Sequence, residues 1–393
     1  MDIQNFSALF NTPARREAFL KLIKDNKTKH IFIQGLEGSS IALFFSNLLE
    51  HKQAHIIIAN DLDEAGYLYN DLVQINGNDH ILLFPSGYKR DIKYGQPDPP
   101  SEILRTEVLN RLCQKGESLL IVTYPEAIAE KVVPVNMLSE QTLHIDKNSK
   151  CDIITLSDKL RERGFEEVDY VYEPGQFAVR GSILDVFSYT NELPYRIDFF
   201  GKEVESIRTF EVETQLSIGK LEEVYIVANV CGQEASGISI LDFIDKNTIL
   251  ICHNLSWVID RISTIASESL SEQTLIAEEG DRYAMQKIID VTAFQKKITT
   301  FRRIDYGANS EANTPAVIRF NCAPQGVYHK NFDLVSQSFS QFIEKGYTLY
   351  ILSDSEKQIE RLQAIFEERG DSISFTPVLK TLHEGFIDND LKI

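Results

Sequence analysis

The first clear structural signal lies in residues 30–42, which read His-Ile-Phe-Ile-Gln-Gly-Leu-Glu-Gly-Ser-Ser-Ile-Ala. The apolar run at 30–34 is short and rich in isoleucine, which predicts a buried strand of a parallel sheet. The glycines at positions 35 and 38 indicate a turn after that strand, and a helix is expected beyond it. A strand that enters a helix through a glycine-rich turn is the setting in which nucleotide-hydrolysing proteins place their phosphate-binding loop.

Similar strand and helix signals continue on both sides of this segment, up to about residue 135. Apolar runs that predict further buried strands lie at 55–59, 80–84 and 118–123. Helices are expected at 13–26, 61–75 and 100–113, and Thr12 and Pro13 suit the start of the first. Strands that alternate with helices predict an α/β fold with a parallel sheet and right-handed crossovers. Residues 1–142 are therefore expected to form a first domain.

The phosphate-binding loop itself is expected to be degenerate. Its pattern, GxxxxGK[ST], uses glycine for close backbone approach, lysine for the β- and γ-phosphates and a hydroxyl for Mg²⁺. Here Ile41 stands in place of the lysine and Ala42 in place of the hydroxyl residue. The positions of this non-functional loop are Gly35, Gly38, Ser39, Ser40 and Ile41. The turn is therefore predicted to be structural, with no catalytic residue and no cofactor.

The pattern changes near residue 143, where short alternating runs replace the apolar ones. Residues 195–200 and 203–210 read as two strands of a hairpin, joined by the two-residue loop Gly201-Lys202. Residues 177–181 and 183–187 predict two more strands around a glycine. An inserted α+β domain is therefore expected at 143–228, a common size for a small domain.

Alternation along these strands selects a set of outward side chains, because successive residues of a strand point to opposite faces. Tyr195, Ile197 and Phe199 fall on one face with Phe177 and Val179, and this set is expected to be core. The opposite face then carries Arg180, Arg196 and Phe200, together with Ala178 and Asp198. Arginine beside an aromatic ring is typical of protein interfaces, but a solvated arginine face with Phe200 packed under a helix explains the pattern as well.

After residue 228 the sequence again predicts strands and helices of an α/β fold. A third region, 229–326, contains an apolar strand at 248–252, and residues 265–315 are too polar to assign. A last small α/β domain is expected at 327–393. Its elements would be a helix at 332–345, a strand at 348–352, a helix at 355–369 and a strand at 372–376. The apolar ending at 391–393 suggests that this domain is truncated.

Composition limits the kinds of function. Among 393 residues, 40 basic and 58 acidic side chains give a net charge of −18, which favours a protein partner over nucleic acid. No apolar run approaches the length of a membrane helix, so no membrane contact is expected. Five scattered cysteines indicate buried thiols in a reducing cytoplasm. No histidine or cysteine spacing indicates a metal site, and a monomer is expected.

Two stretches resemble a known family. Residues 172–187, Tyr-Glu-Pro-Gly-Gln-Phe-Ala-Val-Arg-Gly-Ser-Ile-Leu-Asp-Val-Phe, and 193–200, Leu-Pro-Tyr-Arg-Ile-Asp-Phe-Phe, are similar to the second domain shared by the excision-repair protein UvrB and the bacterial transcription-repair coupling factors (Mfd). Residues 120–128 are similar to the end of the first domain in both. The lost lysine at 41, and a segment 88–100 too short for the DNA-gripping hairpin of UvrB, favour the amino-terminal module of the coupling factors.

The resemblance implies an arrangement and a role. It implies domain 1A at 1–142, domain 2 at 143–228, domain 1B at 229–326 and domain 3 at 327–393, with a degenerate P-loop NTPase-like first domain. It also implies that domain 2 recruits UvrA in nucleotide excision repair through Arg180, Arg196 and Phe200. The ATP- and Mg-dependent DNA translocase motor and the RNA polymerase-binding region of the family would lie beyond residue 393. The alternatives are a UvrB-like DNA-dependent ATPase that binds damaged DNA, and a scaffold whose domain 2 is masked in the longer protein.

Overall fold

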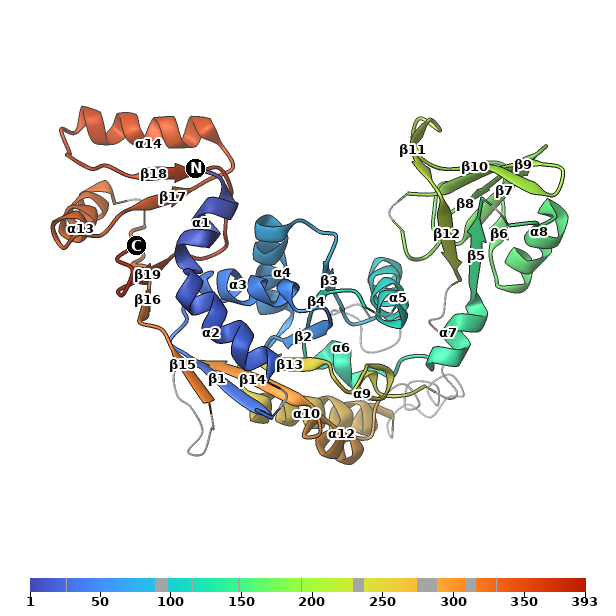
Figure 1. Ribbon diagram of the computed structural model, residues 1–393, viewed down its shortest axis with the longest axis horizontal. Coiled ribbons are helices and arrows are strands. Elements are labelled where there is room, and N and C mark those ends of the chain that lie inside the picture. The colour runs from blue at the N-terminus through green and yellow to red at the C-terminus, as the bar shows by residue number, and fades with distance from the viewer. Residues whose placement is uncertain are drawn as a thin grey trace.

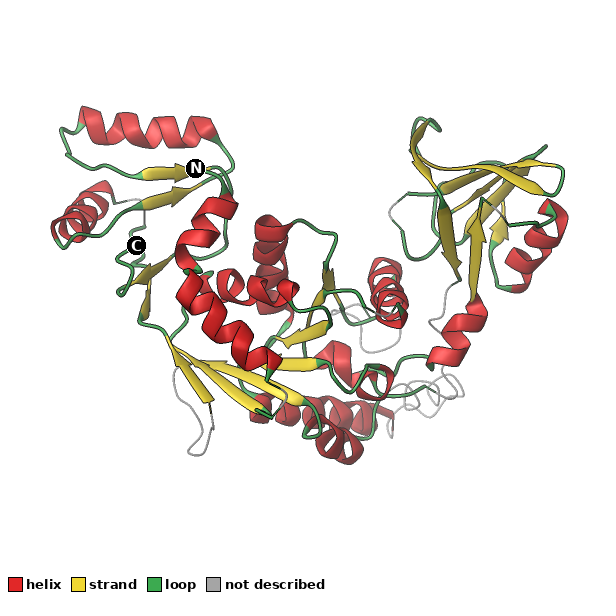
Figure 2. Ribbon diagram, in the orientation of Figure 1, coloured by secondary structure: helices red, strands yellow, loops and turns green. Residues whose placement is uncertain are grey.

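A computed structural model of the chain describes residues 1–25, 27–88, 98–114, 116–147, 149–191, 193–228, 237–273, 288–307, 316–329 and 331–393. Figure 1 shows a central α/β body, with a second sheet at one end and a smaller C-terminal unit at the other. Figure 2 shows how helices and strands alternate through the central body, whereas strands dominate the part of the chain that contains the second sheet.

The central body is built on a seven-stranded sheet in which every neighbouring pair is parallel. Its order is β15 (Ala316–Arg319), β1 (His30–Gln34), β14 (Arg302–Gly307), β13 (Ile249–Cys252), β2 (Ala54–Ile58), β4 (Leu119–Thr123) and β3 (Ile81–Leu83). The prediction of an α/β fold with a parallel sheet is confirmed. Four of its strands precede the inserted sheet in the chain and three follow it, so both halves of the chain share one hydrophobic core.

Helices lie on both faces of this sheet, as buried parallel strands require (Figure 1). They are α1 (Ile3–Phe10), α2 (Pro13–Lys24), α3 (Ser40–Phe45), α4 (Leu62–Asn76), α5 (Pro99–Cys113), α6 (Pro125–Ala129), α9 (Ile240–Phe243), α10 (Leu255–Gln273) and α12 (Val291–Ile298), with a 3₁₀ turn at Ser46–Glu50. Thr12 accepts a hydrogen bond from the amide of Arg15, and Asp61 accepts one from the amide of Glu64. These side chains satisfy amides that the first helical turn leaves unpaired, so the predicted helix starts are confirmed.

The inserted sheet has six strands in the order β11 (Ser217–Leu221), β10 (Glu203–Phe210), β9 (Tyr195–Phe200), β8 (Ile183–Val186), β7 (Gln176–Arg180) and β6 (Glu166–Glu167). The antiparallel pair β5 (Thr142–Asp146) and β12 (Glu223–Val227) connects it to the central body, where α7 (Val135–Gln141) precedes β5. Helix α8 (Ile153–Glu162) covers one face and contributes Leu156 and Leu160 to a separate core. The predicted hairpin, the two predicted strands before it and its glycine-led loop are all present.

The C-terminal unit contains β17 (Tyr350–Leu352) and β18 (Thr376–Val378) as a parallel pair, with α13 (Phe332–Glu344) and α14 (Glu356–Glu368). A short antiparallel pair, β16 (Cys322–Pro324) and β19 (Phe386–Asp388), ties the chain end back to the segment that follows β15. The prediction of a strand at 372–376 is wrong, because β18 begins only at Thr376 and includes Pro377. A proline is tolerated there because β18 is an edge strand, and the register directs the proline nitrogen away from β17.

Several predictions fall wholly or partly outside the described residues. These are most of 88–100, where a hairpin was expected to be missing, Cys231, and parts of 265–315. The described part of 265–315 holds the end of α10, α12 and β14, so it supplies a strand to the centre of the sheet.

Three further observations concern only the described part of the chain. No helix there is long and apolar enough to cross a membrane. Cys113, Cys151, Cys252 and Cys322 are free thiols. No group of three or more histidine, cysteine, aspartate or glutamate side chains is placed to hold a metal ion among these residues.

Candidate functional site

The strand register of the inserted sheet places charged side chains in rows across one face. Asp185 on β8 lies opposite Arg196 on β9, which in turn lies opposite Arg208 on β10. Arg180 on β7 lies opposite Ile183, which lies opposite Asp198 on β9. Phe200 follows Asp198 by two positions in the same strand and therefore extends from the same face. We call this set the charged face: Arg180, Asp185, Arg196, Asp198, Phe200 and Arg208.

Asp185 is the centre of the charged face. Its carboxylate is buried and accepts hydrogen bonds from Nε and Nη2 of Arg196 at 2.7 and 2.9 Å. Nη2 of Arg180 bonds the same carboxylate. Because Arg196 donates these hydrogen bonds to the Asp185 carboxylate, its charged form is favoured and its pKa is raised above the ordinary value.

Arg196 is more buried than its outward position in the alternating strand pattern predicts. Only 13% of its side chain is exposed, since its guanidinium lies 4.3 Å above the ring of Phe210 and donates to the carbonyl of Gln215 at 2.9 Å. A small second core, made of Val171, Ala178, Phe187 and Phe210, covers this part of the face. The prediction that Arg196 and Ala178 are outward and exposed is therefore wrong about exposure, although both lie on the predicted side of the sheet.

The exposed part of the charged face begins where that cover ends. Phe200 is 78% exposed at the tip of the β9–β10 hairpin, so the alternative in which its ring packs under a helix is wrong. The side chain of Arg180 is 36% exposed, and its guanidinium lies 5.0 Å from the ring centre of Tyr170. Tyr170 and Tyr172 are themselves exposed. An exposed ring and a partly exposed arginine beside tyrosines have the composition of interface anchors.

The strand-to-helix turn at 35–42 has the predicted backbone but contains no open phosphate cradle. Gly35 and Gly38 have φ angles of +81° and +52°, which favour glycine. The amide of Ser39 donates to the carbonyl of Glu384 at 3.1 Å, so the C-terminal segment occupies this donor. A Cβ at Gly38 would lie 2.7 Å from the carbonyl oxygen of Gly385. The main chain at 383–385 therefore lies directly over the turn.

The neighbouring amides are also used within the chain. Glu37 N–H donates to Oγ of Ser40 at 2.9 Å, and the amides of Ser40 and Ile41 donate to carbonyls of the same turn. A phosphate-binding loop depends on amides that point at the ligand, and here four candidates, at 37, 39, 40 and 41, already have acceptors.

Asp71 of α4 fastens the covering segment. Its carboxylate accepts from Oγ of Ser39 at 2.5 Å and from the amide of His383 at 2.7 Å. Ser39 Oγ in turn accepts from the amide of Glu384 at 3.0 Å. Burial raises the pKa of Asp71, and its two hydrogen bonds oppose that shift. The ring of His383 stacks on Tyr67 with 3.4 Å between the ring centres.

Comparison with known proteins identifies the inserted sheet. Residues 143–230 match the family described as the UvrB interaction domain. The inserted sheet is therefore similar to this family, and we call residues 143–228 the UvrB interaction domain after it. The match begins at the second residue of β5 and ends after β12, so it includes nearly all of the pair of strands that connects the domain to the central sheet.

Nearly the whole chain is similar to one kind of protein, the transcription-repair-coupling factor. It is 20% identical over 422 residues to that of Staphylococcus epidermidis, covering 91% of this chain and 35% of the relative. It is 22% identical to that of Staphylococcus aureus, covering 86% of this chain and 34% of the relative. It is also 22% identical to that of Bacillus subtilis, covering 91% and 36%. The family resemblance is confirmed, and the chain spans about a third of the length of these relatives.

Sequence reasoning missed two members of the charged face in the UvrB interaction domain. Asp185 and Arg208 lie on the same face of the sheet as Arg180 and Arg196. The outward set predicted from the sequence did not include residues of β8 and β10. A cross-strand register built from the Gly181 turn and the Gly201 turn would have aligned them. Nothing in the sequence indicated that the covering segment at 383–385 contacts Ser39, because Glu384 lies 345 positions further along the chain.

The geometry predicts that substitutions of Arg196 and of Phe200 have different effects on the stability of the domain. We expect Arg196→Ala to lower the free energy of unfolding of the UvrB interaction domain by about 1.5–3 kcal/mol, since Asp185 stays buried and loses its two-bond partner. Phe200→Ala should change it by less than about 0.5 kcal/mol, because the ring is exposed. Urea denaturation followed by circular dichroism measures both. Ile197→Ala, in the core beneath, is the positive control, and equal stability of Arg196→Ala and wild type would contradict this assignment.

Proposed function

We propose that this chain is a non-catalytic module of a transcription-repair coupling factor and that its UvrB interaction domain recruits UvrA during nucleotide excision repair. The observation that carries the proposal is the charged face, where Phe200 stands in solvent at the open end of an arginine–aspartate cluster. The family match of residues 143–230 supports the choice of partner class. In this proposal, ATP-driven movement along duplex DNA and contact with RNA polymerase belong to other parts of the longer relatives.

Within the proposal the three arginine and aromatic positions have different roles. Phe200 and Arg180 present surface that a partner can cover, so they are assigned to direct contact. Arg196 is assigned mainly to holding Asp185, and through Asp185 it fixes the position of Arg180. A partner that meets this face is expected to offer an apolar pocket for the ring and carboxylate or carbonyl oxygens for the Arg180 guanidinium.

The local charge of the face differs from that of the domain around it. Residues 143–217 contain 15 acidic and 9 basic side chains. The charged face itself carries three arginines, Arg180, Arg196 and Arg208, against the carboxylates of Asp185 and Asp198. Recognition is therefore expected to rest on short-range contacts, because a net-negative domain gives little long-range attraction for an acidic partner surface.

We expect Phe200→Ala to weaken UvrA binding by about thirtyfold, the effect of losing a central anchor worth about 2 kcal/mol. Its melting temperature should equal that of wild type, because Phe200 is largely exposed. Affinity for purified UvrA by surface plasmon resonance, paired with thermal melts, measures this.

Ile218→Ala is the matched control, since Ile218 is also an exposed apolar residue, on the edge strand β11 of the same sheet. It should bind UvrA like wild type. If Phe200→Ala binds UvrA as tightly as wild type does, the recruiting surface lies elsewhere on the domain.

The absence of nucleotide chemistry in this module is part of the proposal, and the covered turn supports it. We expect isothermal titration calorimetry with ATP and Mg²⁺ to show no saturable binding, because the amides at 37, 39, 40 and 41 already have acceptors within the chain. The double substitution Ile41→Lys with Ala42→Ser restores the side chains of the loop pattern but leaves those amides occupied. The double variant should therefore also show no saturable ATP binding. A micromolar dissociation constant for the wild-type chain would favour the UvrB-like ATPase instead.

A further inference from the structure

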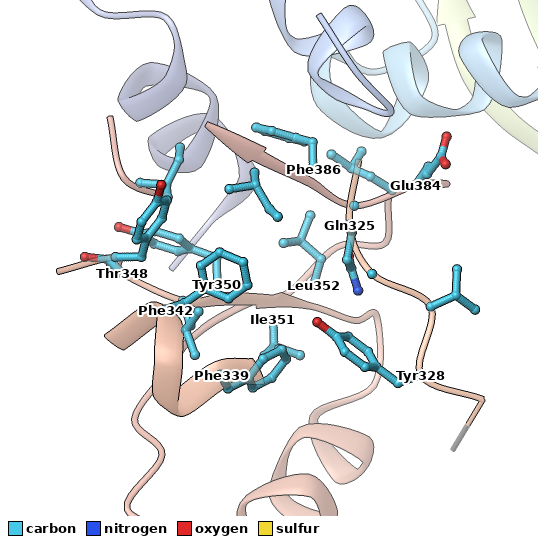
Figure 3. A pocket seen from close by; sticks show the side chains of 18 of the residues that line it. Gln325, Tyr328, Phe339, Phe342, Thr348, Tyr350, Ile351, Leu352, Glu384 and Phe386 are labelled. Atoms are coloured by element: carbon cyan, nitrogen blue, oxygen red, sulfur yellow. The ribbon is translucent and has the colours of Figure 1, made fainter. Parts of the chain in front are cut away.

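The cavity of the C-terminal unit is walled in part by the chain's own last segment. Its volume is about 630 Å³, and Figure 3 shows Phe339 on one side of it and Phe386 on the other. Residues 382–387 and Ile393 belong to its wall, so the described lining gives no sign of a separate partner. An exposed loop of the UvrB interaction domain, residues 168–175, does give such a sign.

This loop joins β6 to β7 and carries exposed tyrosines beside the charged face. Tyr170 is 50% exposed and Tyr172 is 57% exposed. Val171, between them, is fully buried in the small second core, together with Phe187 and Phe210. The loop therefore lies against the sheet at Val171, while the rings on either side of this residue remain accessible to a partner.

The backbone of the loop is also fixed by hydrogen bonds. The amides of Tyr172 and Glu173 donate to Oε1 of Gln176 at 3.0 and 3.1 Å. Nε2 of Gln215 donates to the carbonyl of Val171 at 3.4 Å. A tyrosine side chain has few rotatable bonds, so an exposed ring on a fixed backbone loses little conformational freedom when a partner covers it.

Tyr170 is paired with the arginine that the proposed function assigns to direct contact. The guanidinium of Arg180 lies 5.0 Å from the ring centre of Tyr170, within the distance of about 6 Å at which a cation is attracted to an aromatic face. Nη2 of Arg180 bonds the carboxylate of Asp185, which is the one acceptor found for this guanidinium among the described residues. Its Nε and Nη1 therefore remain available to an acceptor on a partner, and a carboxylate would form the strongest hydrogen bonds with them.

The strand register places Tyr170 and Arg180 close enough to Phe200 for one partner to reach all three. Arg180 lies opposite Ile183 on β8, which lies opposite Asp198 on β9. Phe200 follows Asp198 by two positions in β9. Neighbouring strands are about 4.8 Å apart and two residues rise about 6.8 Å, so the Cα atoms of Arg180 and Phe200 are separated by about 12 Å. A standard protein interface covers about 800 Å² on each side, which corresponds to a patch about 30 Å across.

We propose that Tyr170 is a second aromatic anchor of the UvrA-binding surface, and that Tyr170 and Arg180 together receive an acidic side chain of UvrA that lies beside apolar surface. The carboxylate binds the available donors of Arg180, and the apolar surface covers the exposed part of the Tyr170 ring. Phe200 meets a separate apolar pocket about 12 Å away, so the partner must present both features at this spacing. This role rests on the proposed function, because UvrA is the partner in both.

Substitutions of Tyr170 test this role through the affinity of the chain for purified UvrA, measured by surface plasmon resonance. Tyr170→Ala should weaken binding by about tenfold, as expected for an anchor at an interface. Tyr170→Phe should bind within about twofold of wild type, because it keeps the ring over Arg180. Tyr170→Leu should weaken binding by about fivefold, since it keeps apolar area but loses the aromatic face. Each variant should melt like the wild-type chain.

Ile154→Ala is the matched control and should bind UvrA like wild type. Ile154 is an exposed apolar residue of the same domain, on α8, which packs on the side of the sheet opposite to the charged face. Equal binding by Tyr170→Leu and wild type would overturn the role of the aromatic face. Weak binding by Tyr170→Ala with a lower melting temperature, not restored in Tyr170→Phe, would assign the tyrosine to folding and overturn its role as an anchor.

Phe200→Ala, measured in the same series, separates this role from the proposed function. If Phe200→Ala weakens binding and Tyr170→Ala binds like wild type, recruitment through Phe200 stands and the second anchor is overturned. If both variants bind UvrA like wild type, or the chain does not bind UvrA at all, both proposals fail. If Tyr170→Ala alone weakens binding, Tyr170 is confirmed as a contact and the assignment of Phe200 is wrong.

Discussion

The buried carboxylate of Asp185 is the constraint on which the proposed recruiting surface depends. A charge in that position is tolerated only with cationic partners that form hydrogen bonds. Arg180 comes from β7 and Arg196 from β9, while Asp185 lies on β8 between them, so one ion cluster connects three strands of the sheet. The cluster fixes the part of the sheet from which Phe200 and Arg180 face solvent. Structural and contact roles therefore divide between residues that the sequence pattern presents as equivalent.

The sequence predicted which side of the sheet these residues occupy and failed to predict how deeply they lie. Alternation is a property of each strand, so Arg196 and Phe200 were correctly assigned to one face. Burial of Arg196 depends on Phe210, at the end of the neighbouring strand β10, and on the carbonyl of Gln215, in the turn that follows β10. The parallel strands of the first third were predicted because each is a continuous apolar run. β14 was missed because its sequence, Arg302-Arg303-Ile304-Asp305-Tyr306-Gly307, carries charges in the centre of the sheet.

The turn at 35–42 is a structural joint between the central body and the C-terminal segment. Its glycines have positive φ angles, and Ser39 and Asp71 bind the main chain at 383–384 there. Arg15 of α2 bonds the buried carboxylate of Asp388 a few residues later, at 2.6 Å, which fastens the same C-terminal segment to the first helices. The central sheet thus serves as a scaffold that holds the C-terminal unit, and the UvrB interaction domain extends from it on the β5–β12 pair.

The central claim is that the exposed end of the charged face contacts UvrA. The most direct measurement is photo-crosslinking with p-benzoylphenylalanine placed singly at position 200, or at position 218 on the edge strand of the same domain, in the presence of purified UvrA. The account expects an efficient covalent adduct to UvrA from position 200 and none above background from position 218, with identical melting temperatures. An adduct from position 218 alone, or from neither position while the two proteins still form a complex, would contradict it.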